Sequence, residues 1–240
     1  PPLPEILAEG VGDLGPQSLN DEIIEIFDEE KAEKSQYIGT AFSIDGRGLW
    51  VTARHVNYGC DQLVLLRPRR SRLRVKNLGE HERADVSILQ TDGGAAALPI
   101  EYSAQEYDQP GFHFGFPRGE PGSVYSKLIG RRTINSKGTR YTREPVLVWA
   151  EKIRIPDSNA SLGGISGGPI LNSDGSVVGI HVAGSVRRGR SYSSLPSKID
   201  ELLNQNDVKI TNTQSPVDLT SLTPTDFSYV GEDLRGDYTV

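Results

Sequence analysis

The chain has 240 residues, 36% of them hydrophobic, enough for one large domain or two small ones with a substantial core. Its formal net charge of -6 argues against nucleic acid or an anionic membrane surface as the main partner, because both repel an acidic protein. No apolar run reaches the length of a membrane-spanning helix, so we expect no membrane insertion.

Residues 1–36 are expected to form an N-terminal arm that leads into a short helix. Residues 1–17 are rich in proline and glycine, which favours an irregular arm. The apolar residues from Leu19 to Phe27 recur at helical spacing behind a run of capping residues, so we predict a short acidic amphipathic helix. We expect this helix to dock on the folded domain; a regulatory or oligomerising segment is the alternative.

From Tyr37 the pattern changes to short β runs separated by turn residues. The Asp45-Gly46 pair between two such runs predicts a hairpin. About six short strands in residues 37–100 are enough to close one small antiparallel barrel. A polar connector leads to a second set of strands in residues 108–198, which predicts a second barrel.

A helix is predicted at residues 196–206, because proline and serine stand at its head and its apolar residues share one face. Residues 37–206 thus form the predicted folded domain. Residues 207–240 show no periodicity and are expected to be a wrapping or disordered tail. The chain does not begin with Met; a removed signal peptide would make the protein periplasmic or secreted, and otherwise we expect it to be cytoplasmic.

One serine stands in an unusually glycine-rich loop, residues 163–169, with the sequence Gly-Gly-Ile-Ser-Gly-Gly-Pro. Glycine is needed where the backbone takes positive φ or approaches another group closely, so this loop is suited to presenting the Ser166 hydroxyl. A serine becomes an effective nucleophile when a histidine accepts its proton and backbone N–H groups stabilise the resulting oxyanion. Upstream, one apolar run ends in Thr-Ala-Arg-His at His55, and Asp85 opens another.

The order His55, Asp85, Ser166, with Gly-x-Ser-Gly-Gly-Pro around the serine, resembles the chymotrypsin/trypsin-like serine peptidases. The likeness is greatest to their HtrA-like and glutamyl-endopeptidase-like bacterial members, and it spans Tyr37 to Leu203. It implies an all-β fold of two six-stranded antiparallel barrels with a terminal helix. No PDZ-sized domain follows in this sequence, which we expect to set the chain apart from HtrA itself.

The resemblance implies a serine endopeptidase with a role for each residue. Ser166 is the expected nucleophile and His55 the general base and then general acid, while Asp85 holds the histidine tautomer and stabilises the imidazolium. The backbone N–H groups of Gly164 and Ser166 are expected to form the oxyanion hole. The nearby aspartates that offer alternatives to Asp85 are Asp61 and Asp92.

Two positions depart from the digestive members of the family. Ile165 stands where those members carry an aspartate that pairs with a newly cut N-terminus, so we do not expect activation by N-terminal insertion. The pattern Gly-x-His-x-x-Gly around His181 resembles glutamyl endopeptidases and 3C-type cysteine peptidases, whose histidine contacts a Glu or Gln side chain. We therefore expect a preference for Glu or Gln at P1, with His181 and the Ser161 hydroxyl in the S1 pocket; a structural core histidine is the alternative.

The remaining chemistry-bearing residues suggest no cofactor. The single cysteine, Cys60, excludes an intrachain disulfide and is expected to be a packed small residue rather than a reactive thiol. The four histidines are scattered, so we predict no metal site and no cofactor, with a peptide or protein as substrate. The sequence leaves the oligomeric state open.

Two other functions are alternatives to the peptidase. One is a catalytically restrained scaffold that binds peptides or proteins, with the site blocked by the N-terminal helix or the C-terminal tail. The other, an esterase, would require the α/β-hydrolase order with histidine last, which this chain lacks.

Overall fold

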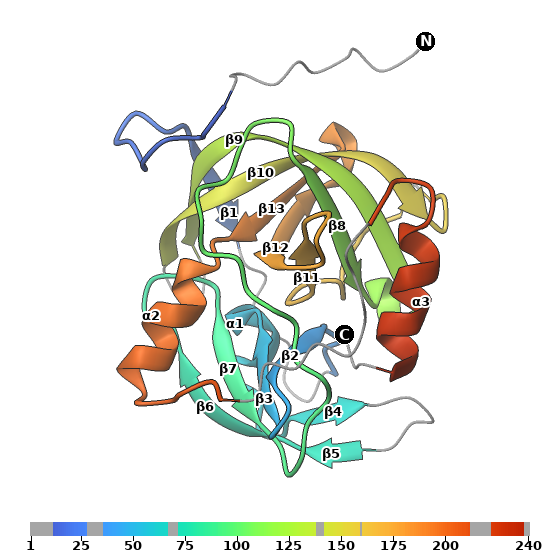
Figure 1. The fold of residues 1–240 in the computed structure, drawn as a ribbon. Helices are drawn as coiled ribbons and strands as arrows, with labels where there is room; N and C mark the ends of the chain where they lie inside the picture. The colour runs from blue at the N-terminus through green and yellow to red at the C-terminus, as the bar shows by residue number, and fades with distance from the viewer. Residues whose placement is uncertain are drawn as a thin grey trace.

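The computed structural model describes residues 12–27, 36–66, 72–137, 142–158, 160–211 and 222–237. Within these residues the strands form a seven-stranded, a four-stranded and a two-stranded sheet, and helices are few (Figure 1). The predicted all-β class is therefore confirmed. Among the described residues, six strands lie in residues 37–100 and six in residues 108–198, as the sequence predicts. Closure of each half into a barrel stays a prediction.

The four-stranded antiparallel sheet follows the order β2-β3-β7-β6. Its strands are β2 (Ala41–Asp45), β3 (Leu49–Thr52), β6 (Lys76–Glu80) and β7 (Ser87–Gln90). Strands β4 (Val64–Leu66) and β5 (Arg72–Arg74) pair as a separate ribbon. Every residue of β2 and β3 is buried, so both faces of this hairpin are covered. Helix α1 (Arg54–Asn57) begins two residues after β3 and carries His55.

The predicted hairpin at Asp45-Gly46 is confirmed between β2 and β3. The fully buried Asp45 carboxylate accepts from the Arg47 backbone N–H at 2.9 Å and pairs with the Arg47 guanidinium. Its second oxygen accepts from the Thr211 N–H at 2.8 Å. The turn therefore also anchors chain that lies beyond the predicted domain.

The seven-stranded sheet has the order β1-β9-β10-β13-β12-β11-β8, with a further pairing of β8 and β9. Its strands are β1 (Ile23–Phe27), β8 (Pro110–Gly115), β9 (Gly122–Lys137), β10 (Thr142–Ile155), β11 (Pro169–Leu171), β12 (Val177–Ser185) and β13 (Arg190–Ser194). Short 3-10 turns, Pro117–Gly119 and Val186–Arg188, follow β8 and β12. The long hairpin of β9 and β10 runs across the sheet in Figure 1.

The prediction of an N-terminal helix is wrong. Residues 23–27 form strand β1, which pairs in parallel with the outer part of β9. Ile24 and Ile26 pack on the sheet, while Ile23 is 49% exposed. Over so few residues, alternation and helical spacing place apolar residues at overlapping positions, and the β-branched isoleucines favour the strand once β9 supplies an edge.

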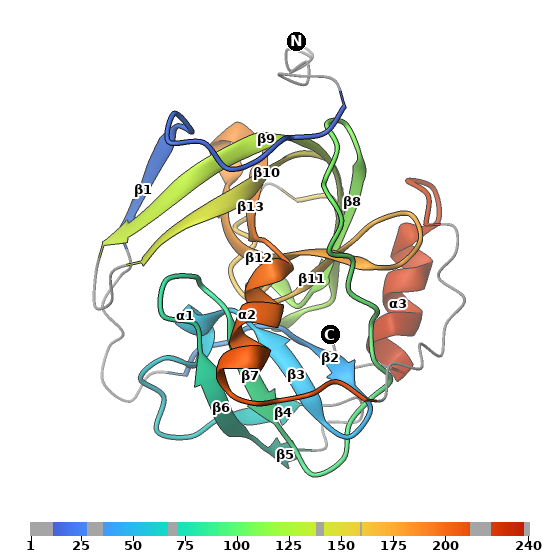
Figure 2. The same ribbon diagram turned by 60° about the vertical axis from the view of Figure 1, so that its left-hand side comes forward.

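The predicted terminal helix is confirmed as α2 (Ser197–Gln205), which buries Ile199, Leu202 and Leu203. Figure 2 shows α2 beside strand β7. Residues 207–240 are expected to be a wrapping or disordered tail; within them the structure has a helix that was not predicted, α3 (Phe227–Asp237), which packs on β8 and β9. Phe227 and Leu234 are fully buried there. Phe227, Val230 and Leu234 recur at helical spacing, a signal that the sequence analysis did not use, and the contact with the sheet supplies the stabilisation.

Candidate active site

The loop that carries Ser166 is held from two sides. The Thr40 N–H donates to the Ser166 carbonyl at 2.8 Å, and the Thr40 hydroxyl donates to the Gly164 carbonyl at 2.8 Å. From the other side, the Gly167 N–H donates to the His181 carbonyl at 2.8 Å. The loop therefore connects the chain just before β2 with strand β12 of the other sheet.

Gly167 places the serine loop against the chain that leads to His55. Its φ of 87° is in the left-handed region that favours glycine, and a Cβ there would lie 2.7 Å from the Ala53 nitrogen. Ala53 is two residues before His55 at the start of α1. The residue after Ser166 and the segment before His55 are thus in direct contact, which brings the two predicted catalytic residues to one region.

The peptide group between Gly163 and Gly164 has a defined orientation. The Arg118 N–H donates to the Gly163 carbonyl at 2.6 Å. In a trans peptide the carbonyl and the next N–H point in opposite directions, so the Gly164 N–H points away from Arg118. Within the described residues, the N–H groups of Gly164 and Ser166 have no hydrogen-bond partner. Two such donors on one loop are what an oxyanion hole requires.

His55 is bonded to Asp85 at two points. The His55 Nδ1 and Asp85 Oδ2 atoms are 2.5 Å apart, and the His55 backbone N–H donates to Asp85 Oδ1 at 2.8 Å. Burial alone would raise the pKa of Asp85, but the charge and hydrogen bonds of His55 and the charge of Arg54 outweigh it and lower that pKa. Asp85 is therefore ionised, Nδ1 carries the proton, and Nε2 of a neutral His55 can act as a base.

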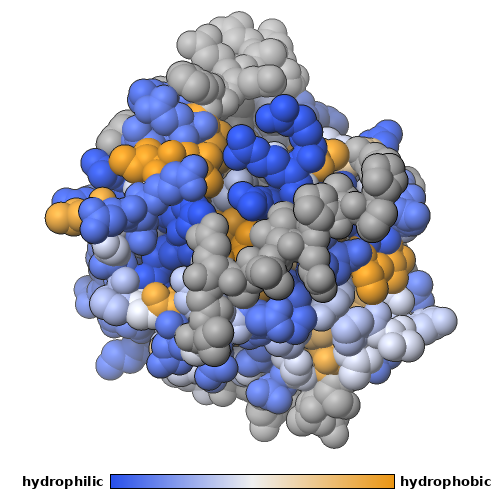
Figure 3. All heavy atoms as spheres, turned by 90° about the horizontal axis from the view of Figure 1, so that it is seen from above, coloured by the Kyte–Doolittle hydropathy of each residue, from blue (hydrophilic) through white to orange (hydrophobic). Residues whose placement is uncertain are grey.

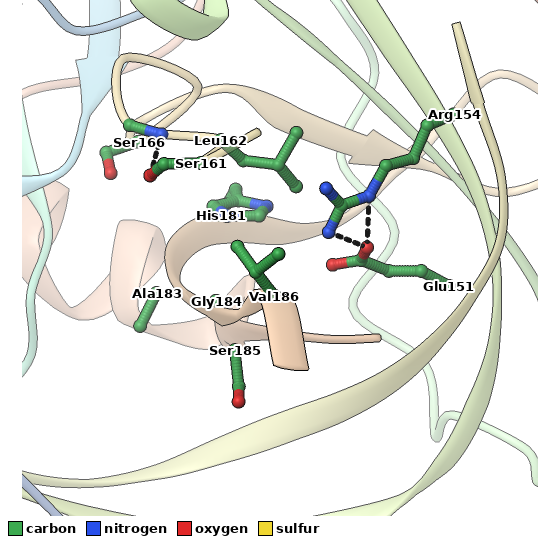
Figure 4. Close-up of a pocket in the computed structure, with 11 residues that line it drawn as sticks. Glu151, Arg154, Ser161, Leu162, Ser166, His181, Ala183, Gly184, Ser185 and Val186 are labelled. Carbon is green, nitrogen blue, oxygen red and sulfur yellow. Dashed lines mark hydrogen bonds and ion pairs between the residues drawn. The ribbon is translucent and has the colours of Figure 1, made fainter. Parts of the chain in front are cut away.

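A pocket beside the serine loop contains the predicted S1 residues. Ser161, Ser166 and His181 all line it, with the other walls formed by Leu162, Gly163, Glu151, Arg154 and residues 183–186 (Figure 4). The Ser161 hydroxyl is exposed and accepts from the Gly163 N–H at 3.1 Å. Ile165 does not line the pocket; it is fully buried, and no carboxylate stands at that place.

His181 belongs to a chain of hydrogen bonds that sequence reasoning missed. The Ser126 hydroxyl donates to the Gly111 carbonyl at 3.0 Å, so its oxygen accepts from His113 Nε2–H at 2.7 Å. The His113 Nδ1 atom must then accept from His181 Nδ1–H, 3.2 Å away. Neutral His181 is left with an unprotonated Nε2, the ring nitrogen not used in this chain of bonds.

The pKa of His181 is lowered to about 3, first by burial and then by the positive charges of His55 and Arg154. His181 is therefore neutral at pH 7, in the tautomer that the chain of bonds selects. Burial likewise lowers the pKa of His113 well below its ordinary value, and the repulsion from His181 acts in the same direction.

The far wall of the pocket carries a half-buried ion pair, which the sequence analysis also missed. Arg154 Nε donates to Glu151 Oε2 at 2.7 Å, and the Ser191 hydroxyl donates to Glu151 Oε1 at 2.6 Å. Arg154 also donates to the Ala160 carbonyl at 3.0 Å, which ties β10 to the approach of the serine loop. Figure 4 shows the pair on the side of the pocket opposite Ser166.

Among the residues that the structure describes, no three His, Cys, Asp or Glu side chains gather as a metal site would require. None of the helices described is long and apolar enough to cross a bilayer. The face in Figure 3 is mainly hydrophilic, with hydrophobic residues in separate patches. Cys60 is half-buried, its sulfur 3.6 Å from the Val56 carbonyl.

Solved structures with the same fold include proteases. The active form of a protease from M. tuberculosis superimposes with a TM-score of 0.60 and 14% identity, covering 74% of this chain and 77% of that one. A serine endoprotease from Yersinia pestis gives 0.55 at 14% identity, covering 73% and 60%. At such identities the likeness shows the fold alone.

Sequence comparisons identify the family. A relative from Pseudomonas fluorescens, named "probable periplasmic serine endoprotease DegP-like", is 28% identical over 160 residues, 63% of this chain. One of the same name from Hahella chejuensis is 27% identical over 150 residues. The chain spans 30% of the length of each. The model of the trypsin-like peptidase domain matches residues 39–180, more than half of the chain. The chain therefore belongs to the family of trypsin-like peptidases.

Proposed function

We propose that the chain is a serine endopeptidase that cleaves peptide bonds through His55, Asp85 and Ser166. The observation that carries the proposal is the double contact of His55 with Asp85, beside a glycine loop that presents Ser166 with two backbone N–H groups unpaired among the described residues. These are the three parts of acyl transfer: a base with its orienting carboxylate, a nucleophile, and donors for the oxyanion.

The proposed reaction has two steps. The Ser166 hydroxyl oxygen attacks the substrate carbonyl carbon while its proton passes to His55 Nε2. The Gly164 and Ser166 N–H groups donate hydrogen bonds to the oxyanion, and Asp85 stabilises the imidazolium. His55 then gives the proton to the leaving amine, which departs and leaves an acyl-enzyme. A water molecule then attacks the acyl carbon while its proton passes to His55. The bond from the acyl carbon to the Ser166 oxygen breaks, His55 returns the proton to that oxygen, and the carboxylic acid product leaves.

We further propose that the S1 pocket accepts Gln or Glu at P1 through His181 and Ser161. A Gln amide N–H can donate to the unprotonated Nε2 of neutral His181. A Glu carboxylate has no proton to donate, so it needs His181 in its protonated form. Because the pKa of His181 is low, the protonated form is scarce at neutral pH, and Gln is favoured over Glu at P1 under that condition.

The two-barrel arrangement and the location are proposals of the same kind. The pairing of β8 with both β9 and β11 supports closure of the second half into a barrel. The word periplasmic in the names of the relatives supports a periplasmic location, which cell fractionation would test.

The test is reaction with a fluorophosphonate probe together with P1 profiling on a random peptide library, for the wild type and for Ser166→Ala. Labelling and cleavage by the wild type alone, concentrated after Gln or Glu, would support both proposals. Cleavage after other residues would keep the peptidase and remove the role of His181 in specificity. A wild type that neither labels nor cleaves would favour a restrained scaffold that binds peptides.

A further inference from the structure

A second carboxyl group lies directly behind Asp85. Glu144 on strand β10 is only 2% exposed, although it is an acidic residue. Its Oε1 accepts from the Asp85 backbone N–H at 2.8 Å, and its Oε2 accepts from the Ser194 hydroxyl at 2.9 Å. Within the described residues it forms no ion pair.

A buried carboxyl without a cationic partner costs stability, so its presence needs a reason. Burial first, and then repulsion from the Asp85 carboxylate, raise the pKa of Glu144 to about 8, while its two hydrogen bonds and the charge of Arg54 oppose the rise. The charged groups facing it are thus Asp85 and Arg54. At neutral pH Glu144 is mainly a neutral acid, in which Oε2 carries the proton and donates to the Ser194 oxygen; the ionised form accepts from the Ser194 hydroxyl instead. Both carboxyls therefore coexist without two adjacent negative charges.

The position of Glu144 links the two halves of the molecule. It lies on β10, and Ser194 lies on β13, which pairs with β10 in the seven-stranded sheet. Asp85 lies just before β7 of the four-stranded sheet. The loop of Ser166 runs into β11 of the seven-stranded sheet. The bond from the Asp85 N–H to Glu144 therefore ties Asp85 to the sheet that carries the nucleophile.

Other contacts to the same segment come from its own half or from α2. Arg54 donates to the His81 carbonyl at 2.6 Å, and the His81 ring accepts from the Ala84 N–H at 3.0 Å while donating to Glu201 at 3.0 Å. These bonds hold residues 81–84. Glu144 acts on the next residue, at the backbone of Asp85 itself.

We propose that Glu144 is a positioning residue, which holds the Asp85 backbone against the seven-stranded sheet so that the Asp85 carboxylate meets both the ring and the backbone N–H of His55. This inference rests on the proposed function. Glu144 does not touch substrate; it acts through Asp85.

The test compares variants that keep or remove the acceptor. Glu144→Gln keeps a carbonyl oxygen for the Asp85 N–H and can donate its amide to the Ser194 oxygen, so kcat should stay within about 3-fold of wild type. Glu144→Leu fills the space without an acceptor, and Glu144→Ala empties it. Both should lower kcat by about 10²-fold with KM nearly unchanged, since a small displacement of a catalytic group has that effect.

Two further readouts separate positioning from general loss of structure. With Asp85 displaced the imidazolium is less stabilised, so the acid limb of the kcat/KM profile should move to lower pH in Glu144→Leu but not in Glu144→Gln. The low-field proton resonance of the bond between His55 Nδ1 and Asp85 should weaken in Glu144→Leu and persist in Glu144→Gln. Thermal melting gives the fraction of each variant that is folded at the assay temperature, and each kcat is divided by that fraction.

Wild-type kcat per folded molecule in Glu144→Leu or Glu144→Ala, with an unchanged resonance, would overturn the inference, as would equal damage by Glu144→Gln. If Glu144→Ala does not fold, the leucine and glutamine variants decide. An inactive wild type that fails to label would sink the proposed function instead. In that case the resonance, which needs no turnover, still decides whether Glu144 positions Asp85.

Discussion

The Nδ1 atoms of His113 and His181 lie 3.2 Å apart in the core behind the pocket, and both rings are at least 99% buried. Two unprotonated nitrogens could not share this contact favourably, so one of them carries the proton. Because Ser126 and the Gly111 carbonyl decide the tautomer of His113, a carbonyl outside the pocket determines whether His181 presents a donor or an acceptor.

The preference between Gln and Glu at P1 should therefore depend on pH. A Glu carboxylate needs protonated His181, whose share grows as pH falls toward its pKa of about 3, whereas Gln binds the neutral form. The ratio of kcat/KM for matched Gln and Glu peptides should fall as pH is lowered from 8 to about 5.5, a range in which the substrate carboxyl stays ionised. The ratio cancels the titration of His55, and a constant ratio would contradict the expectation.

Gly164→Ala should disable the oxyanion hole. A Cβ there would lie 2.6 Å from the Phe116 carbonyl, and the φ of 102° is strained for any L side chain, so the peptide group must rotate. We expect kcat to fall about 10²–10³-fold, the usual effect of losing one donor. Gly93→Ala is the control, since its φ of 75° is likewise positive, nothing lies within 4 Å of its Cβ, and it does not line the pocket. Similar losses in both variants would contradict a special role of Gly164.

Helix α3 should contribute to the stability of the fold rather than regulate access of substrate to the pocket. Phe227→Ala removes a fully buried ring that packs near Phe112, and should lower the free energy of unfolding by about 3–5 kcal/mol. The control Tyr229→Ala on the same helix removes a side chain that is 70% exposed. It should change the free energy of unfolding by less than about 0.5 kcal/mol. Denaturant titration measures both; equal effects would mean that α3 does not pack on the core in solution.

Glu144 should make the stability of the wild type depend on pH. Its pKa in the folded protein, about 8, is above the ordinary value of 4.5, so folding favours its protonated form. The stabilisation is complete below about pH 4.5 and is lost as pH rises toward 8. The stability of the wild type relative to Glu144→Gln should therefore fall between pH 5 and 8, as measured by urea titration at several pH values. The pKa of Asp85 is lowered, so Asp85 makes stability depend on pH only in the acid range below that window. An unchanged difference would contradict the raised pKa.

Local sequence was sufficient to predict those features whose chemistry restricts the residue types within a few neighbouring positions. Gly164, Gly167 and Gly168 are required by positive φ or by close backbone contacts, and this requirement is visible in the sequence as a cluster of glycines around Ser166. The hairpin at Asp45 likewise carries its turn residues, and the helix α2 its buried apolar face, within a few positions. The structure also brings Ser161, Ser166 and His181 to one pocket, while their roles stay predictions.

Tertiary structure decided the features that depend on distant partners. Ile24 and Ile26 lie in a strand because β9 offers an edge, and Phe227 lies in a helix because the β8 and β9 surface covers it. Glu144 meets Asp85 from 59 residues away, and His113 meets His181 from 68. Backbone preferences of about 1 kcal/mol or less per residue are smaller than the free energy of burying an apolar side chain or of leaving a buried polar group unpaired. Burial and the pairing of buried polar groups therefore prevail over local preference, and both arise only when distant parts of the chain come together.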